Sequence, residues 1–171
     1  MACALLLGAA HPLAAQGSDP TALSLYYRAV GEHFSVPAAE ILILSEWRLP
    51  PEEIPVVLWM ARRAGISPDA VVALRQAGRD WSDVAARYRV NASAFHVVLD
   101  GNGGSLAHAY ESYRGRPAGE WSSIQLDDGE IVGLVNLGVL ADILRASPAA
   151  LLQTRDRTGS WVDAFRTLSR R

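Results

Sequence analysis

The sequence contains no lysine, and all 16 of its basic side chains are arginine. Its one cysteine, Cys3, lies in a segment that we expect to be removed. Disulfides, cysteine-ligated zinc and a cysteine nucleophile are then excluded, so that packing must stabilise the fold. The formal net charge of −2 gives no global attraction to nucleic acid or to anionic membranes. Half of the 171 residues are hydrophobic and a fifth are charged, a composition typical of a globular chain.

The N-terminus has a short apolar run and no basic residue before it. Residues 2–10 are too few to span a membrane, which requires about 20 apolar residues. Pro12 and the small residues around Ala15 resemble the end of a secretory leader. We therefore expect a signal peptide over residues 1–16, export to the periplasm or the medium, and no membrane span in the mature chain. The alternative is an apolar N-terminus on a cytoplasmic protein.

One stretch occurs twice, over residues 67–89 and 147–171. The second copy follows the first by 80 residues without a gap. The matching pairs are Ser67 and Ser147, Pro68 and Pro148, Ala70 and Ala150, Arg75 and Arg155, Trp81 and Trp161, and Asp83 and Asp163. An internal repeat of this kind indicates how a chain is built before it indicates a function.

Each copy has the pattern of two helices joined by a tight turn. Ser67 is a favourable N-cap, and Pro68 is tolerated in the first turn. Gly78 ends the first helix, and Asp80 is expected to cap the second, with Asp83 at N3 in a capping-box-like relation. Trp81 is then expected to pack inward. The unit is therefore interpreted as a folding module.

The remaining segments also favour helices. Apolar spacing and proline positions predict the following helices: from Pro20 to about His33, from Pro37 to about Leu49, from Pro51 to Ala64, from Ser105 to Tyr113, and from Ile131 to Leu144. The last of these is apolar almost all round and is expected to be the central helix. The segment from Trp121 to Gly129 is expected to be an extended link.

The fold class predicted is all-α, a helical bundle of two related halves. Each half is expected to contain a long apolar helix followed by the helix-turn-helix unit, and the two halves cover each other's apolar faces. The expected organisation is the leader, a first half over residues 20–98, a glycine-rich connection over 99–104, and a second half over 105–171.

Three segments together resemble a family. They read IPVVLWMARRAGISPDAVVALRQAGRDWSDVAARYRV, AHAYESYRGRP and DDGEIVGLVNLGVLADIL. They resemble exported bacterial proteins with paired helical repeats, a group without an established activity, over roughly residues 36–165. The glycine-rich loop before Ser105 has no proline, unlike that group. The resemblance implies export and an α-fold and transfers no catalytic residue.

Two alternative functions follow from weaker patterns. The helix-turn-helix outline, with Arg87 and Arg89 on its second helix, suggests a cytoplasmic DNA-binding regulator, although nearby acids oppose phosphate binding. A partial calcium-loop outline places Asp100, Asn102 and Glu111 at positions 1, 3 and 12, but position 5 offers no side-chain oxygen. We therefore expect no cofactor and no metal.

The candidate chemical groups are few. His33, His96 and His108 have no metal-ligand spacing, and His108 has only Tyr110 or Glu111 as an imagined acid–base partner. A cluster rich in aromatic and arginine side chains is typical of recognition surfaces. This predicted partner surface consists of Tyr110, Tyr113, Arg114, Arg116 and Trp121.

These observations predict an exported, non-enzymatic helical domain with a structural or protein-interaction role in the bacterial envelope. Its expected partner is an envelope protein or another unidentified protein.

Overall fold

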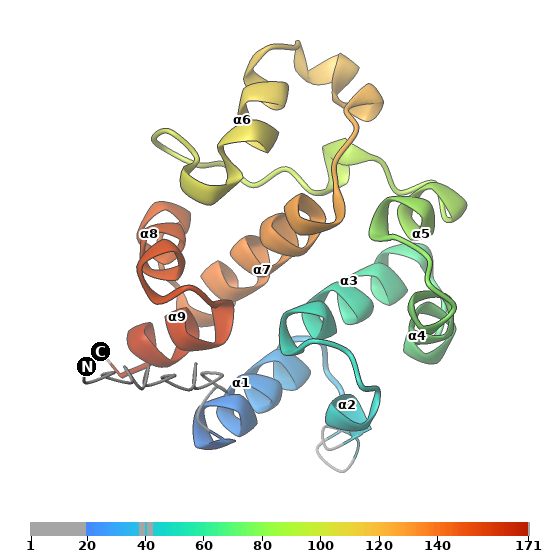
Figure 1. Ribbon diagram of the computed structural model, residues 1–171, viewed down its shortest axis with the longest axis vertical. Coiled ribbons are helices and arrows are strands. Elements are labelled where there is room, and N and C mark those ends of the chain that lie inside the picture. The colour runs from blue at the N-terminus through green and yellow to red at the C-terminus, as the bar shows by residue number, and fades with distance from the viewer. Residues whose placement is uncertain (1–19, 38–39, 41–42, 171) are drawn as a thin grey trace, which may run out of the picture.

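Figure 1 shows the computed structural model, which describes residues 20–37, 40 and 43–170. These described residues form helices and turns and contain no strand, which confirms the all-α prediction. The α-helices are α1 (Pro20–His33), α2 (Ile43–Glu46), α3 (Ile54–Ala64), α4 (Pro68–Gln76), α5 (Trp81–Arg87), α6 (Ala107–Arg114), α7 (Asp128–Leu144), α8 (Pro148–Thr158) and α9 (Trp161–Leu168). The short 3-10 helices are η1 (Pro51–Glu53), η2 (Ala92–Ala94), η3 (Gly104–Leu106) and η4 (Ala118–Ser123).

Helix α7 lies at the centre of the molecule and contacts α1, α3, α5, α8 and α9. Its apolar side chains are buried on several sides, as its sequence predicts. Asp127 begins the helix through a capping box. Its carboxylate accepts the N–H of Glu130, and the Glu130 carboxylate accepts the N–H of Asp127.

The segments α3–α4–α5 and α7–α8–α9 have the same element order. Ser67 and Ser147 act as the N-caps of α4 and α8, where each hydroxyl oxygen accepts a backbone N–H three residues ahead. Trp81 and Trp161 are the first residues of α5 and α9, and both side chains are almost fully buried. Each indole contributes about 4–6 kcal/mol of transfer free energy, before the cost of ordering the chain.

A smaller group of elements covers the end of α7 at which that helix begins. Figure 1 shows α6, at the top of the view, together with the chain that leads into α7. The turn η3 contacts α7 and α8, while η2 contacts η4. Gly133 allows the close approach of η3 to α7, because a Cβ at this position would overlap the side chain of Leu106.

Two predicted elements differ from the structure. The helix expected from Pro37 to Leu49 is reduced, in the described residues, to α2, because Pro50 restricts the residue before it and Arg48 has a positive φ of 55°. The link expected from Trp121 to Gly129 begins inside η4 and is non-helical only from Ile124 to Asp127, with an extended backbone at both of these residues.

The predicted leader, Cys3 and the caps expected at residues 18 and 19 lie outside the described residues. Within the part of the chain that is described, no single helix has the length and hydropathy needed to cross a membrane. Helices α7 and α8 meet that test only as a pair, with a bend of 116° between them.

Candidate functional site

Two carboxylates connect elements that lie far apart in the sequence. Asp128, in the first turn of α7, accepts the backbone N–H of Trp81 at 2.5 Å. Glu52, in η1, accepts the backbone N–H of Trp161 at 2.6 Å. Each carboxylate thus satisfies one of the free N–H groups at the start of a helix and places negative charge there, where the helix dipole favours it.

The capping box predicted at Asp80 and Asp83 is wrong. Asp80 occupies the N-cap position of α5 but makes no side-chain cap hydrogen bond. Asp83 is exposed, with its carboxylate 3.9 Å from Arg79. The carboxylate of Asp128 reaches the first N–H of α5 instead, so a side chain from a distant helix supplies this acceptor. In the second copy, by contrast, the Ser160 hydroxyl accepts the N–H of Asp163 at 3.0 Å, as a local cap should.

Arg75, in the first copy, binds two carboxylates from outside that copy, Glu53 and Asp128. Its guanidinium donates two hydrogen bonds to Glu53, at 3.1 and 2.8 Å, and one to Asp128 at 2.9 Å. It also lies over the Trp81 ring, 4.7 Å from the ring centroid. Burial lowers the pKa of Arg75, but the hydrogen bonds and charges of Glu53 and Asp128 raise that pKa above its ordinary value.

Arg155, at the matching position of the second copy, is less fully paired. Its guanidinium carbon lies 5.8 Å from the centroid of the Trp161 ring, and its closest carboxylate, Asp156, is 3.5 Å away. The Nε of Arg155 is buried and has no hydrogen-bond partner among the described residues. The two copies therefore share their helices and differ in their ion pairs.

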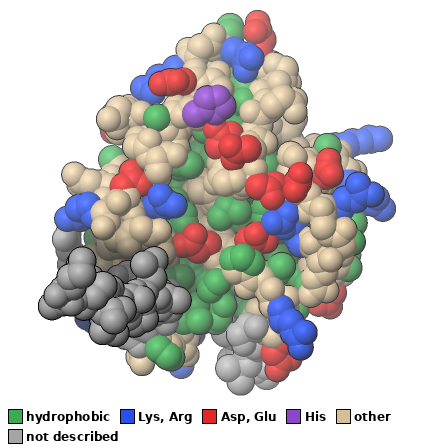
Figure 2. Space-filling view, viewed as in Figure 1, with side chains coloured by type: hydrophobic (Ala, Val, Ile, Leu, Met, Phe, Trp, Pro, Cys, Tyr) green, Lys and Arg blue, Asp and Glu red, His purple; other side chains and the backbone are tan. Residues whose placement is uncertain are grey.

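Arg155 and Trp161 line a hollow of about 480 Å³ together with Glu52, His108 and Glu130. Figure 2 shows several acidic side chains across the middle of one face, with a histidine above them. Burial raises the pKa of Glu52, and the N–H of Trp161 partly opposes that rise. The hollow therefore has more acidic than basic groups, but Glu52 already accepts the N–H of Trp161 and Glu130 is already paired with His108.

His108 pairs with Glu130, and not with Tyr110 or Glu111, the two groups considered as acid–base partners. The distance from Nδ1 of His108 to the carboxylate of Glu130 is 2.6 Å. This hydrogen bond and the negative charge of Glu130 raise the pKa of His108. Sequence reasoning missed Glu130 as a partner, although the spacing of Asp127 and Glu130 could have identified the capping box that fixes this carboxylate.

The predicted partner surface contains both buried and exposed side chains. Tyr110 and Tyr113 are 5% and 1% exposed, and their hydroxyls donate to the carbonyl oxygens of Val97 and Ala92. Burial raises the pKa of Tyr110 to about 12. These two rings therefore pack inside the molecule and cannot themselves present a contact face.

The other members of that cluster lie nearer to solvent. Arg114 and Arg116 are exposed, and Arg114 donates to the carbonyl of Gly101 at 3.1 Å. Trp121 is half-buried, and its ring centroid is 4.2 Å from that of His96. Burial lowers the pKa of His96. A partner role for the arginines and Trp121 stays a prediction.

The glycine-rich segment is attached to α8. Asp156 accepts the N–H of Ser105 at 3.1 Å, and Asn102 accepts the N–H of Gly104 at 3.2 Å. Glu111 lies within α6, so the twelve-residue calcium loop is not formed. Across residues 20–37, 40 and 43–170, no three His, Cys, Asp or Glu side chains are grouped closely enough to hold a metal ion.

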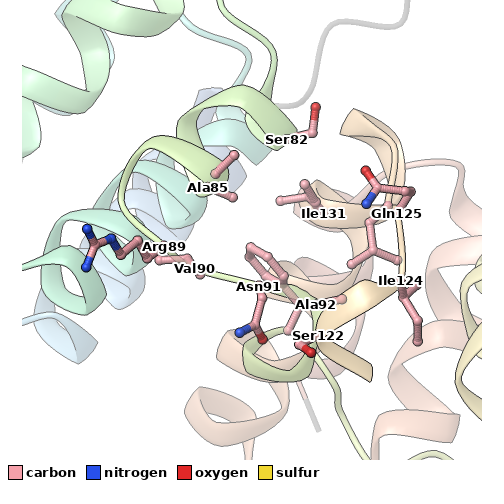
Figure 3. Close-up of a pocket in the computed structure, with 13 residues that line it drawn as sticks. Ser82, Ala85, Arg89, Val90, Asn91, Ala92, Ser122, Ile124, Gln125 and Ile131 are labelled. Atoms are coloured by element: carbon pink, nitrogen blue, oxygen red, sulfur yellow. The ribbon is translucent and has the colours of Figure 1, made fainter. Parts of the chain in front are cut away.

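A separate groove of about 340 Å³ lies between α5, η2, η4 and α7. In Figure 3, Ala85 and Val90 stand on one wall, Ile124 and Gln125 stand on the other, and Ile131 lies between them. The remaining lining is apolar or neutral, apart from one charged residue at the rim, Arg89. Sequence reasoning did not find this groove, because it is formed by segments that are distant in the chain.

No family model, curated protein or solved structure matches the chain. A functional conclusion therefore rests on the geometry of the molecule itself.

Proposed function

We propose that this chain is an exported, non-enzymatic helical domain with a structural or protein-interaction role in the bacterial envelope. The observation that carries the proposal is the use of the repeated unit's polar groups. Its serines cap helices, Arg75 pairs with Glu53 and Asp128, and its buried tryptophans receive carboxylates from other elements. These particular groups, which could otherwise carry out chemistry, are engaged in holding the fold together.

We also propose that the fold consists of two related halves that pack on each other. The identical element order of α3–α5 and α7–α9 supports this arrangement, as does the contact between α3 and α7. The two carboxylate contacts are reciprocal. Asp128 belongs to the second half and binds the first, whereas Glu52 belongs to the first half and binds the second.

The geometry favours this function over a DNA-binding regulator. Helix α9 buries Trp161, Val162, Ala164 and Phe165 against the rest of the protein. Helix α5 exposes Asp83 in its first turn, where a recognition helix approaches the bases. Filter binding of duplex DNA at low salt tests the point, and we expect no retention, because non-specific phosphate binding would already appear there.

Cell fractionation with mass analysis of the mature N-terminus tests export. We expect a chain that lacks residues 1–16 in the envelope or the medium. An intact Met1 in the cytoplasm would overturn the proposal.

In-cell photocrosslinking tests the interaction role. A photoreactive amino acid is introduced in turn at Arg116, on the predicted partner surface, at Gln125, beside the groove, and at Arg63, on neither. All three side chains are exposed. We expect a defined protein adduct from Arg116 or Gln125 and none from Arg63. Adducts from no position, or equally from all three, would count against a specific interaction role.

A further inference from the structure

We propose that the groove between α5 and η4 binds an extended peptide segment of a partner protein, with an apolar side chain inserted and an acidic residue beside it. This inference rests on the proposed interaction role and names the class of partner. It is carried by three observations: an unpaired extended backbone, an apolar floor, and the charge at the rim.

The first observation is the backbone that forms one wall of the groove. Ile124 has φ −66° and ψ 132°, and Asp127 has φ −81° and ψ 172°, so the chain enters and leaves this segment extended. Ile124 and Leu126 are buried and Gln125 between them is exposed, which is the alternation of a strand.

The backbone polar groups in the middle of this segment have no hydrogen-bond partner among the described residues. The N–H of Ile124 donates to the carbonyl of Trp121, but the N–H and C=O groups of Gln125 and Leu126 form no hydrogen bond with any described residue. The described residues form no sheet, but a short extended segment with free donors and acceptors can pair with an extended peptide as a two-stranded ladder. Main-chain hydrogen bonds would then give affinity for any peptide in that conformation.

The second observation is the apolar floor. Ala85, Phe95 and Ile131 line the groove below the extended segment and come from α5, the end of η2 and α7. A volume of about 340 Å³ is at the lower end of the range for binding pockets, which suits one or two side chains of a peptide. The floor therefore selects an apolar residue at the inserted position.

The third observation is the charge at the rim. Arg89 is the one charged residue among those that line the groove, and no acidic residue lines it. Figure 3 shows the Arg89 side chain pointing away from the floor. It would therefore meet a carboxylate that flanks the inserted residue and not the inserted residue itself. No carboxylate lines the groove to compete for Arg89, so an acidic peptide is favoured over a basic one.

Arg89 also allows a clean test, because its backbone has a positive φ of 57° just after α5. Glycine adopts this conformation more readily than arginine. Arg89→Gly should therefore remove the charge without lowering the melting temperature. Arg145→Gly is a matched control, since Arg145 is also exposed and has φ 50° after α7, away from this groove.

The probe is a library of random eight-residue peptides, selected against the full mature chain. We expect enrichment of peptides with an apolar residue and Asp or Glu within two positions of it. A selected peptide should bind Arg89→Gly at least tenfold more weakly and Arg145→Gly as tightly as the parent chain. Equal binding to both variants, or selected peptides without an acidic residue, would overturn the charge assignment and with it the proposal.

Amide hydrogen exchange tests the backbone contact independently of the charge. Because Gln125 and Leu126 donate to no described residue, their amides should exchange fast in the free protein. At least one should slow by tenfold or more when the peptide binds. A bound peptide that leaves both amides unprotected would rule out strand addition.

The interaction role in the envelope and peptide binding in the groove can each be disproved without the other. Envelope localisation with adducts from Arg116 but none from Gln125 would keep the interaction role and remove the groove. A selected peptide that protects Gln125, in a protein that stays unprocessed in the cytoplasm, would keep the groove and remove the envelope role.

Discussion

Asp128 accepts the backbone N–H of Trp81 at 2.5 Å across 47 residues of sequence. The same carboxylate binds Arg75 at 2.9 Å, and Arg75 covers the Trp81 ring. The Asp128 carboxylate, at the start of α7, therefore holds the first N–H of α5 and also holds Arg75 in place over the buried Trp81 ring. The contact ties the central helix to the first copy of the repeated unit.

Asp128→Ala should lower the free energy of unfolding by about 2 kcal/mol, because it removes a helix-terminus acceptor and one hydrogen bond of a mostly buried arginine. Urea unfolding measures the change. Asp83→Ala is the control, and it should cost less than about 0.5 kcal/mol, since Asp83 is exposed and 3.9 Å from Arg79. Equal losses from the two variants would show that Asp128 has no special role.

Tyr26→Phe should lower the free energy of unfolding by about 2 kcal/mol. The Tyr26 hydroxyl donates to Oδ1 of Asn136 at 2.7 Å, and both side chains are fully buried. Without that hydroxyl, Oδ1 of Asn136 is left unpaired inside α7, at a desolvation cost. Tyr27→Phe removes the hydroxyl of a half-buried residue next to Tyr26 and should change the melting temperature little. Thermal unfolding of the two variants compares them, and a loss in Tyr27→Phe that matches Tyr26→Phe would refute this account.

Glu52→Gln should flatten the dependence of stability on pH above 4.5, the ordinary pKa of a glutamate. Burial raises the Glu52 pKa in the folded chain, so its contribution to stability is fully present below 4.5 and is lost as pH rises through the folded value. Unfolding is measured from pH 4 to pH 8 for both proteins. The parent should lose stability relative to Glu52→Gln as pH rises, and the opposite slope would contradict the assigned shift.

His108 and His96 should titrate on opposite sides of the ordinary histidine pKa of 6.5. Glu130 raises the pKa of His108, whereas burial lowers that of His96. Proton-detected NMR of the ring carbons follows both groups in one sample. Glu130→Gln should return the His108 value toward 6.5 and leave His96 unchanged. A His108 titration that is insensitive to this change would disprove the pairing.

Much of the fold could be predicted from the sequence, because its signals are local. Ser67 and Ser147 cap helices, and Pro68 and Pro148 begin them, as expected from their side chains alone. The apolar stretch from Ile131 onward gave the central helix for the same reason. The local prediction that Asp80 caps α5 was wrong. Asp128, which is distant in the sequence, accepts the first N–H of α5 instead.

The candidate sites were less predictable. Tyr110 and Tyr113 were expected at a partner surface, yet both are buried and donate to carbonyl groups of the segment before α6. An aromatic side chain has the same identity in a core and at an interface, so composition alone does not separate the two. No pattern in the sequence predicts the groove lined by Gln125, because its walls come from four elements that are separate in the chain.

The sequence by itself determined the all-α class and the starts of several helices, since each of these depends on residues within a few positions of one another. The tertiary structure decided which carboxylate meets which helix, which aromatic rings are buried, and where an extended backbone is left unpaired. Those features depend on groups separated by 47 residues at Trp81 and 109 at Trp161. Only packing brings such groups within hydrogen-bonding distance, and local spacing does not encode it.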